Sequence, residues 1–318
     1  MSHLQSDSLG HTLLAAAQLP STQDFMRAHT AQLGDGTVMV ADVQTAGKGR
    51  GGNVWTSPDG CLMFSACRKL KVPGVQAPFV NYVISLGLVR GVRDAVAAAA
   101  PNLLRPLDVR IKWPNDIYAN GLKIGGILIH TTWSVDRFNV VAGIGLNVTN
   151  RAPTTCLAQL LEEAAASAGA SSSTPHTGEP STPHTGASTL HTGGASTPHT
   201  SGASTLLTRE LLLACVLQRL EQAFDTFERS GFGPLEGEYL DAWLHSGQRV
   251  VAHDPETAGG SGGGGAAGAD GPVGLTIRGL SPGGYLLAVS DAGVSYELTP
   301  DGNSLDMMNG LVRRKVQQ

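Results

Sequence analysis

The chain has 318 residues, of which 41% are hydrophobic and 15% charged, enough apolar material for the cores of two ordinary domains. Its formal net charge is −4. The chain therefore lacks the strong basic excess that is typical of proteins that bind nucleic acids or anionic membrane surfaces. No uncharged apolar run approaches the roughly 20 residues of a membrane span, so we expect no membrane partner.

Strand-like and helix-like patterns alternate through the first half of the chain. Strands are predicted where β-branched and other apolar residues cluster, at residues 38–43, 62–66, 109–112, 124–129 and 138–148. From Phe79 to about Ala98, apolar residues recur at the spacing of a helix. Asn120-Gly121 supplies a turn between two of the strands. Hairpins combined with a few helices predict an α+β fold.

A low-complexity segment occupies about residues 162–205. The words STPHTG, STLHTG and STPHTS recur there at uneven spacing, and Ser, Thr, Pro and Gly dominate. Because such a composition cannot bury a core, we expect a disordered insert within a larger domain at residues 1–246.

Ordered structure is predicted to resume after the insert. Helices are expected at residues 206–228 and about 235–244, followed by short strands at 248–252, 273–279, 285–289 and 295–298. These strands indicate a small β domain at residues 247–318. A glycine-rich loop at 259–271 interrupts its first hairpin.

The four cysteines are scattered and form neither CxxC pairs nor a dense disulfide framework. They are expected to be buried thiols in a reducing compartment. The first residues show neither a secretory signal nor an arginine-rich transit peptide. We therefore expect a cytoplasmic protein, with a plastid or mitochondrion as the alternative if a leader is missing from this chain.

The first motif that indicates chemistry is the run GKGRGG at residues 47–52. It differs from a dinucleotide fingerprint because no helix opens after it, and from a Walker loop because no Gly-Lys-Ser/Thr ends it. What remains is a mobile glycine loop carrying two cations, Lys48 and Arg50, which suits an anionic ligand. A flexible surface loop with incidental charge is the alternative.

The second motif is KWPND at residues 112–116, followed by KIGGIL at 123–128. Lys112 and Lys123 flank one hairpin and are expected to converge on one pocket. Asp116 is placed to hold Mg²⁺ or to orient a lysine. Two cations near a carboxylate suit a reaction that moves charge between phosphate and carboxylate oxygens, although an ordinary surface hairpin has the same spacing.

The third motif is GIGLNV at residues 143–148. Alternating glycines in a strand allow a ligand or another backbone to approach closely, and the amide of Asn147 is able to read a base edge. A tightly packed strand is the alternative interpretation.

Taken together, these blocks resemble the catalytic domain of biotin–protein ligases, and most closely the plant-type holocarboxylase synthetases. The resemblance covers nearly everything outside the two inserts. It rests on these segments: PSTQ, AGKGRGGNVWTSPDG, KWPNDIYANGLKIGGILI, GIGLNVTN with PTTCL, WLHSGQRV and LTPDGNSLDMMNGLVRRK. It implies a class II synthetase-like catalytic domain with a mixed sheet and helices, followed by a small SH3-like β barrel.

The resemblance also implies residue roles. Biotin contacts are expected at Ser21, Thr22, Gln23, Gln44, Lys48, Gly49, Arg50 and Lys123. Contacts with ATP or the adenylate are expected at Lys48, Arg50, Trp55, Asn115 and Asn147. Catalytic roles fall to Lys123, Lys112 and Asp116, and Asp116 is the expected Mg²⁺ ligand. Gln23 stands where many members have Asn, and the loop has fewer arginines than in bacterial members.

The implied reaction has two steps. Biotin and ATP form biotinyl-5′-adenylate and pyrophosphate, and a lysine of a biotin carboxyl carrier domain of a carboxylase then takes the biotin. No helix-turn-helix precedes Ser21, so DNA is not expected as a partner. A lipoate–protein ligase and a non-catalytic biotin-binding module are the alternatives. The cationic glycine loop followed by Trp55 favours biotin over lipoate as the substrate. The presence of Lys112, Asp116 and Lys123 favours an enzyme over a binding module, because a pure binder needs no charge directed at a phosphate.

Overall fold

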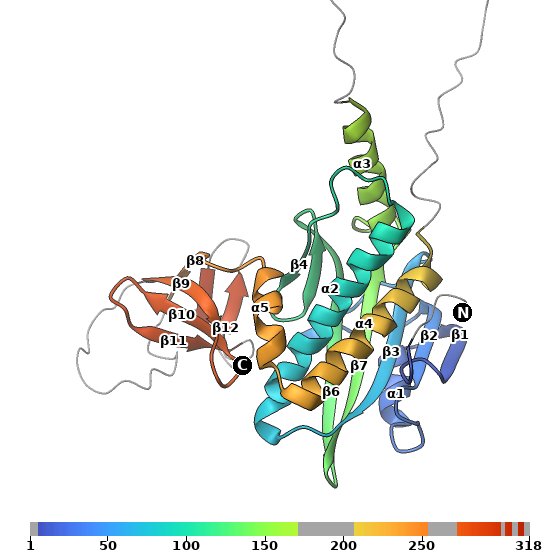
Figure 1. Ribbon diagram of the computed structural model, residues 1–318, viewed down its shortest axis with the longest axis horizontal. Coiled ribbons are helices and arrows are strands. Elements are labelled where there is room, and N and C mark those ends of the chain that lie inside the picture. The colour runs from blue at the N-terminus through green and yellow to red at the C-terminus, as the bar shows by residue number, and fades with distance from the viewer. Residues whose placement is uncertain (1–5, 171–206, 254–271, 300–302, 307–310, 315–318) are drawn as a thin grey trace, which may run out of the picture.

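A computed structural model describes residues 6–170, 207–253, 272–299, 303–306 and 311–314 of the chain (Figure 1). The larger domain is built on a seven-stranded mixed sheet in the order β1-β2-β3-β7-β6-β5-β4. β1 and β2 are parallel and all other neighbours are antiparallel. The strands are β1 (Leu13–Leu19), β2 (Val38–Gln44), β3 (Cys61–Leu70), β4 (Val109–Lys112), β5 (Asp116–Ala119), β6 (Leu122–Ser134) and β7 (Arg137–Asn147).

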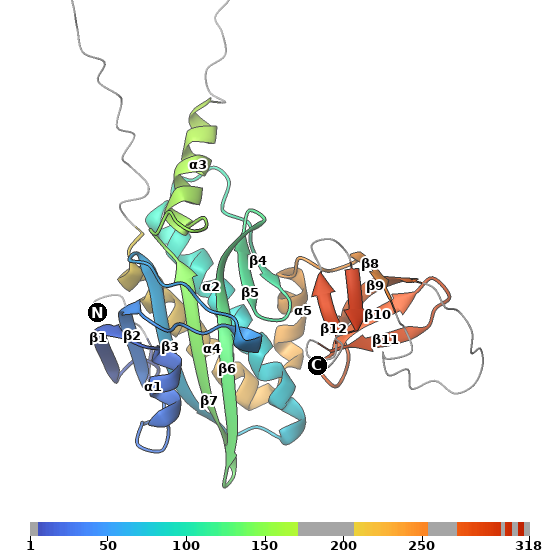
Figure 2. The ribbon, with the colours of Figure 1, turned by 180° about the vertical axis from the view of Figure 1, so that it is seen from behind.

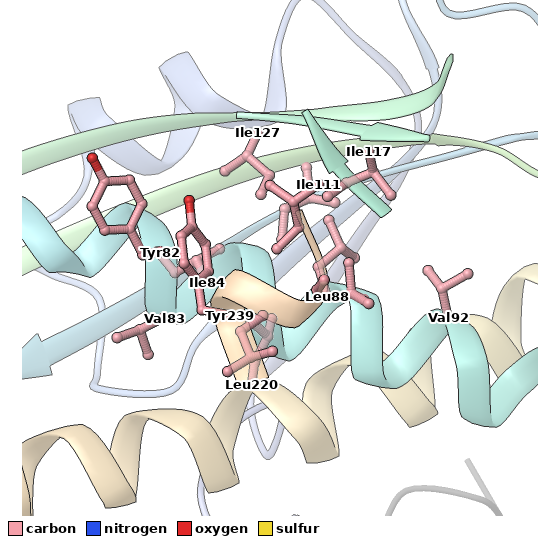
Figure 3. Close-up of a cluster of buried hydrophobic side chains, with 14 of the residues drawn as sticks. Tyr82, Val83, Ile84, Leu88, Val92, Ile111, Ile117, Ile127, Leu220 and Tyr239 are labelled. Carbon is pink, nitrogen blue, oxygen red and sulfur yellow. The ribbon is translucent and has the colours of Figure 1, made fainter. Parts of the chain in front are cut away.

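Two long antiparallel helices, α2 (Val80–Ala99) and α4 (Arg209–Ser230), cover one face of the sheet (Figure 1). They approach closely because α2 has glycine where they cross: a Cβ at Gly87 would lie 2.9 Å from the Leu220 side chain. Their buried side chains meet the isoleucines of β4, β5 and β6, as Figure 3 shows for Ile111, Ile117 and Ile127. This is the main core of the domain.

The stretch Gly74–Ala99 has the length and hydropathy of a membrane span, but 67% of its apolar window is buried inside the protein. It comprises η2 (Gly74–Phe79) and α2. Since it packs against α4 and the sheet, it is accounted for as the core helix of this domain.

The opposite face of the sheet carries the short helix α1 (Thr22–Ala28) (Figure 2). Ser21 caps this helix, because its side chain accepts a hydrogen bond from the Asp24 backbone N–H. Met26 packs with Met39, Cys67 and Val141 in a second, smaller core. The rest of this face, over β6 and β7, is left without a covering helix and is where the pocket forms.

The C-terminal part forms a second sheet of six strands in the order β11-β10-β9-β8-β13-β12. Its strands are β8 (Arg249–Ala252), β9 (Val273–Leu280), β10 (Leu286–Ser290), β11 (Ser295–Leu298), β12 (Asn303–Asp306) and β13 (Leu311–Arg314). The first four match the predicted strands, and the predicted glycine-rich loop lies outside the described residues. The Tyr82 hydroxyl of α2 donates to the Gly284 carbonyl, which ties this sheet to the larger domain.

Two predicted boundaries are wrong. The insert was expected to begin near residue 162, but α3 (Leu157–Ala170) continues through that position because its alanine-rich end has high helix propensity. The last helix, α5 (Gly233–Asp241), ends earlier than residue 244, because Trp243 instead forms a bridge beside Ile111 of β4. The sequence patterns also missed β1, α1, β12 and β13, which are short or lack strict periodicity.

Candidate active site

The uncovered face of the larger sheet holds a pocket of about 450 Å³. Five segments line it: the start of α1, the end of β2, the glycine loop with Trp55, the β4–β5 turn, and the glycine-containing centres of β6 and β7. In Figure 2 the segment after β2 crosses in front of these strands. The lining residues are Ser21, Thr22, Gln23, Gln44, Lys48, Gly49, Arg50, Gly51, Asn53, Val54, Trp55, Asn115, Asp116, Lys123, Gly126, Ile127, Leu128, Gly143, Ile144 and Gly145.

The glycine loop is folded back on itself as a small hairpin. The Gly49 N–H donates to the Asn53 carbonyl at 2.7 Å, and the Trp55 N–H donates to the Gly47 carbonyl at 2.9 Å. Gly51 has a φ of +66°, the left-handed conformation that glycine adopts without strain. The loop carries both predicted cations, Lys48 and Arg50, at the pocket wall.

One loop cation is anchored to α1. Lys48 Nζ lies 2.7 Å from Asp24 Oδ2, and about half of the lysine side chain is exposed. An exposed ion pair of this kind contributes at most about 1 kcal/mol. The contact therefore holds Lys48 near the pocket without fixing it strongly, and an anionic ligand can compete with Asp24 for it.

The Trp55 indole packs against two glycines of the sheet, Gly126 and Gly145. A Cβ at Gly145 would come within 2.7–2.9 Å of three indole atoms, so the ring occupies space that only a glycine leaves open. The indole Nε1 is buried and has no hydrogen-bond partner among the described residues. Lys123 Nζ is 5.9 Å from the centroid of the ring, within cation–π range.

Lys123 and Asp116 form an ion pair within the pocket. Lys123 Nζ lies 2.8 Å from Asp116 Oδ1, with 41% and 25% of the two side chains exposed. The pair follows from register, since Asp116 and Tyr118 of β5 lie beside Gly126 and Lys123 of β6. The Asp116 carboxylate therefore orients Lys123, which faces the pocket. The same carboxylate acts on its neighbour Tyr118, since burial raises the pKa of Tyr118 and the negative charge of Asp116 adds to this rise.

The floor of the pocket beneath α1 is polar and buried. Gln44 Oε1 accepts from the backbone N–H of Thr22 at 2.8 Å and lies 3.0 Å from the Thr22 hydroxyl. Gln23 Nε2 donates to the Val141 carbonyl at 2.9 Å. Amides and hydroxyls held in this way present fixed hydrogen-bonding groups to a ligand.

Two predicted residues are not brought to the pocket wall. Lys112 stands over the Tyr118 ring, 5.7 Å from its centroid, and does not line the pocket that Lys123 lines. Asn147 is buried, and its amide donates to Thr154 Oγ1 at 2.8 Å. The roles predicted for Lys112 and Asn147 remain predictions, but neither side chain lines the pocket.

The sequence analysis missed three polar residues around the site. Asp24 holds Lys48, Ser57 Oγ accepts from Gln44 Nε2 at 3.2 Å, and Ser65 contacts both Thr22 and Gln23. Ser65 is fully buried, and its position in the apolar run CLMFSAC was a usable signal. A lone hydroxyl in a buried strand needs a partner.

Comparison with known proteins first gives the class. The biotin/lipoate A/B protein ligase family model matches residues 15–147. This segment holds the glycine loop, both hairpin lysines and the polar floor. Fold and site therefore define a ligase of the biotin or lipoate class.

Relatives that match nearly the whole of this chain narrow the class to biotin ligases. Biotin–protein ligase 2 of Arabidopsis thaliana is 37% identical, over 99% of this chain and 81% of its own. The human biotin–protein ligase is 30% identical, over 98% of this chain and 37% of its own. The biotin protein ligase from Aquifex aeolicus in complex with biotin and ATP shares the fold, with a TM-score of 0.57 and 22% identity, over 96% of this chain and 100% of that one.

The chain belongs to the biotin–protein ligases. It is a biotin–protein ligase, an enzyme that attaches biotin to protein.

Proposed function

We propose that biotin binds with its ring against the floor formed by Thr22 and Gln44 and with its carboxylate beside Lys123. The observation that carries this proposal is the pairing, within one pocket, of a buried hydrogen-bonding floor with Lys123 and Lys48 at its wall. A neutral polar ring fits the floor, and negative charge fits the lysines.

The lysines act on the charge that moves during adenylate formation. When a carboxylate oxygen of biotin attacks the α-phosphorus of ATP, the bond from that phosphorus to the pyrophosphate oxygen breaks. Lys123, oriented by Asp116, offsets the charge that passes between carboxylate and phosphate oxygens. Lys48 and Arg50 face the phosphates from the glycine loop, and Trp55 covers the adenine. The loop limits access of water, which would hydrolyse the adenylate.

Asp116 also suits the Mg²⁺ that accompanies ATP. Its carboxylate lines the pocket, and Mg²⁺ commonly takes one or two protein carboxylates and completes its shell with phosphates and water. No group of three or more His, Cys, Asp or Glu residues forms a metal cluster in the described part of the chain, which suits an ion carried by the nucleotide. Bound there, Mg²⁺ would offset phosphate charge.

The acceptor is proposed to be the lysine of a biotin carboxyl carrier domain of a carboxylase. The amine attacks the mixed anhydride, an amide bond forms, and AMP leaves. The four cysteines are free, which supports a reducing compartment and the cytoplasm as the place of action.

The lipoate alternative is disfavoured by the floor. The dithiolane of lipoate has no N–H or C=O to meet the hydroxyl and amide groups of Thr22, Gln23 and Gln44, so burying it there would leave their remaining hydrogen-bonding capacity unused. Biotin's ureido group supplies both donors and an acceptor. The floor therefore favours biotin.

The test is to incubate the protein with ATP, Mg²⁺ and a carboxyl carrier domain, with either biotin or lipoate. Mass spectrometry should show the biotin adduct on the carrier lysine and release of AMP and pyrophosphate, with no lipoyl adduct. Equal lipoylation would show that the floor does not select the ring. Binding of biotin without pyrophosphate release would contradict the proposed roles of the lysines.

The insert is expected to be dispensable. Replacing residues 171–206 with a short Gly/Ser linker should leave the biotinylation rate within a few-fold of the natural protein, because α3 and α4 lie intact on either side. The measurement is the initial rate of carrier biotinylation beside a thermal melt. A large loss of rate at an unchanged Tm would show that the insert contributes to acceptor binding or catalysis.

A further inference from the structure

Four oxygen atoms lie in a row beneath the start of α1. In order they are Gln44 Oε1, Thr22 Oγ1, Ser65 Oγ and Gln23 Oε1, and the successive separations are 3.0, 2.9 and 3.1 Å. Thr22, Gln23 and Gln44 line the pocket, whereas Ser65 lies behind them, fully buried in β3.

Both ends of the row are acceptors, because other contacts fix the amide orientations. The backbone N–H of Thr22 can only donate, so the Gln44 atom 2.8 Å from it is the oxygen. The Val141 carbonyl can only accept, so the Gln23 atom 2.9 Å from it is the nitrogen, and Gln23 Oε1 faces Ser65.

The row is therefore one proton short. It has three oxygen–oxygen contacts, but its hydrogens are the two hydroxyl protons of Thr22 and Ser65. The buried Gln23 carbonyl needs a donor, and Ser65 supplies it. Once its single proton is used on Gln23, Ser65 Oγ can only accept from Thr22, and a chain directed in this way is strengthened by cooperativity. In this arrangement Gln44 Oε1 keeps its backbone donor, and the contact between Thr22 Oγ1 and Gln44 Oε1 is left without a proton.

We propose that Ser65 is a specificity-determining positioning residue, which draws the Thr22 proton away from Gln44 and so opens an acceptor for an N–H group of the ligand. Both atoms of the open contact belong to residues that line the pocket. Without Ser65 the Thr22 proton turns to Gln44, and the contact is filled. This inference rests on the proposed function, because it takes the biotin ring as the occupant of the floor.

The test compares the binding of two ligands of nearly equal shape. Biotin carries ureido N–H groups, and a cyclic carbamate analogue replaces one of them with oxygen; each of the two carbamate isomers is measured by titration calorimetry. The natural protein should prefer biotin over one isomer by about tenfold or more, the loss expected when an N–H donor gives way to a repelling oxygen.

In Ser65→Ala this preference should fall by about tenfold, because the acceptor contact is lost. Biotin should bind more weakly while the carbamate is little affected. Ser65→Cys, which keeps a weaker S–H donor, should give an intermediate preference. The control is Ser85→Ala, since Ser85 is equally buried but bonds the Asn81 carbonyl within α2; it should leave the preference unchanged.

A purely structural role of Ser65 predicts a different result. It would weaken biotin and the carbamate alike and leave their ratio as in the natural protein, and that outcome would overturn the inference. If the natural protein binds biotin but shows no preference over either isomer, the open acceptor does not exist. If the natural protein does not bind biotin, the proposed function falls as well.

Discussion

Replacing Lys123 with alanine is expected to slow adenylate formation by a factor of about 10²–10³. This is the usual effect of removing one preorganised group that stabilises charge developing in the transition state. The Tm should stay close to that of the natural protein, because 41% of the side chain is exposed and it packs little core. The measurement is single-turnover release of pyrophosphate, alongside a thermal melt. Lys123→Arg should restore only part of the rate, because a planar guanidinium does not place its charge where a compact ammonium does.

Two other lysines make this prediction specific. Lys71 is exposed and pairs with Asp136 at 3.4 Å, away from the pocket lining, so Lys71→Ala should leave the rate unchanged.

Lys112→Ala discriminates between the two lysines of the hairpin, Lys112 and Lys123. Because Lys112 stands over Tyr118 rather than at the pocket wall, we expect its loss to slow pyrophosphate release less than that of Lys123. The reverse order would make Lys112 the lysine that meets the phosphate.

Replacing Gly145 with alanine is expected to reduce adenylate formation by about 10²-fold, because displacing a group that positions the substrate by about 1 Å has an effect of this size. A Cβ at this position would meet three atoms of the Trp55 indole at 2.7–2.9 Å, and the rigid ring has to move off the sheet. If Trp55 covers the adenine, the KM for ATP should rise more than the KM for biotin. Steady-state kinetics with each substrate varied in turn measure the difference.

Gly237→Ala is the matched control for this substitution. Gly237 lies in α5 and a Cβ there would meet nothing within 4 Å, so alanine should leave activity unchanged and add slightly to helix stability. Unchanged ATP kinetics in Gly145→Ala would mean that the indole position does not matter. An equal rise in both KM values would place Trp55 against the whole adenylate rather than its adenine.

Asp116 orients Lys123 and is also the proposed Mg²⁺ ligand, and these two roles are compatible. Its carboxylate orients Lys123 at 2.8 Å in the described structure, and the same group is the proposed Mg²⁺ ligand. Only one of its oxygens is used by the lysine, so the other remains for a metal ion brought by ATP. The ion pair therefore keeps Lys123 in place before the nucleotide arrives.

The sequence by itself determined the long helices, most of the strands and the blocks that carry the chemistry. The long helix at Val80–Ala99, the strands around KWPND and the Asn-Gly turn were predicted correctly, because hydrophobic periodicity and turn chemistry are local properties of the chain. The glycine loop, Asp116 and Lys123 were also named from their motifs, and Trp55 from the family resemblance. The structure brings all of them to one pocket.

Only the tertiary structure decided which of the named residues meet. Lys112 and Lys123 look equivalent in sequence, yet the register of β4, β5 and β6 places one over Tyr118 and the other at the pocket wall. Ser65 and Thr22 lie 43 residues apart and become neighbours only when α1 packs on β3. Contacts of this kind depend on strand order and on which face each side chain takes. Neither is encoded within a local window of sequence, so the oxygen row at the pocket floor became visible only in the folded chain.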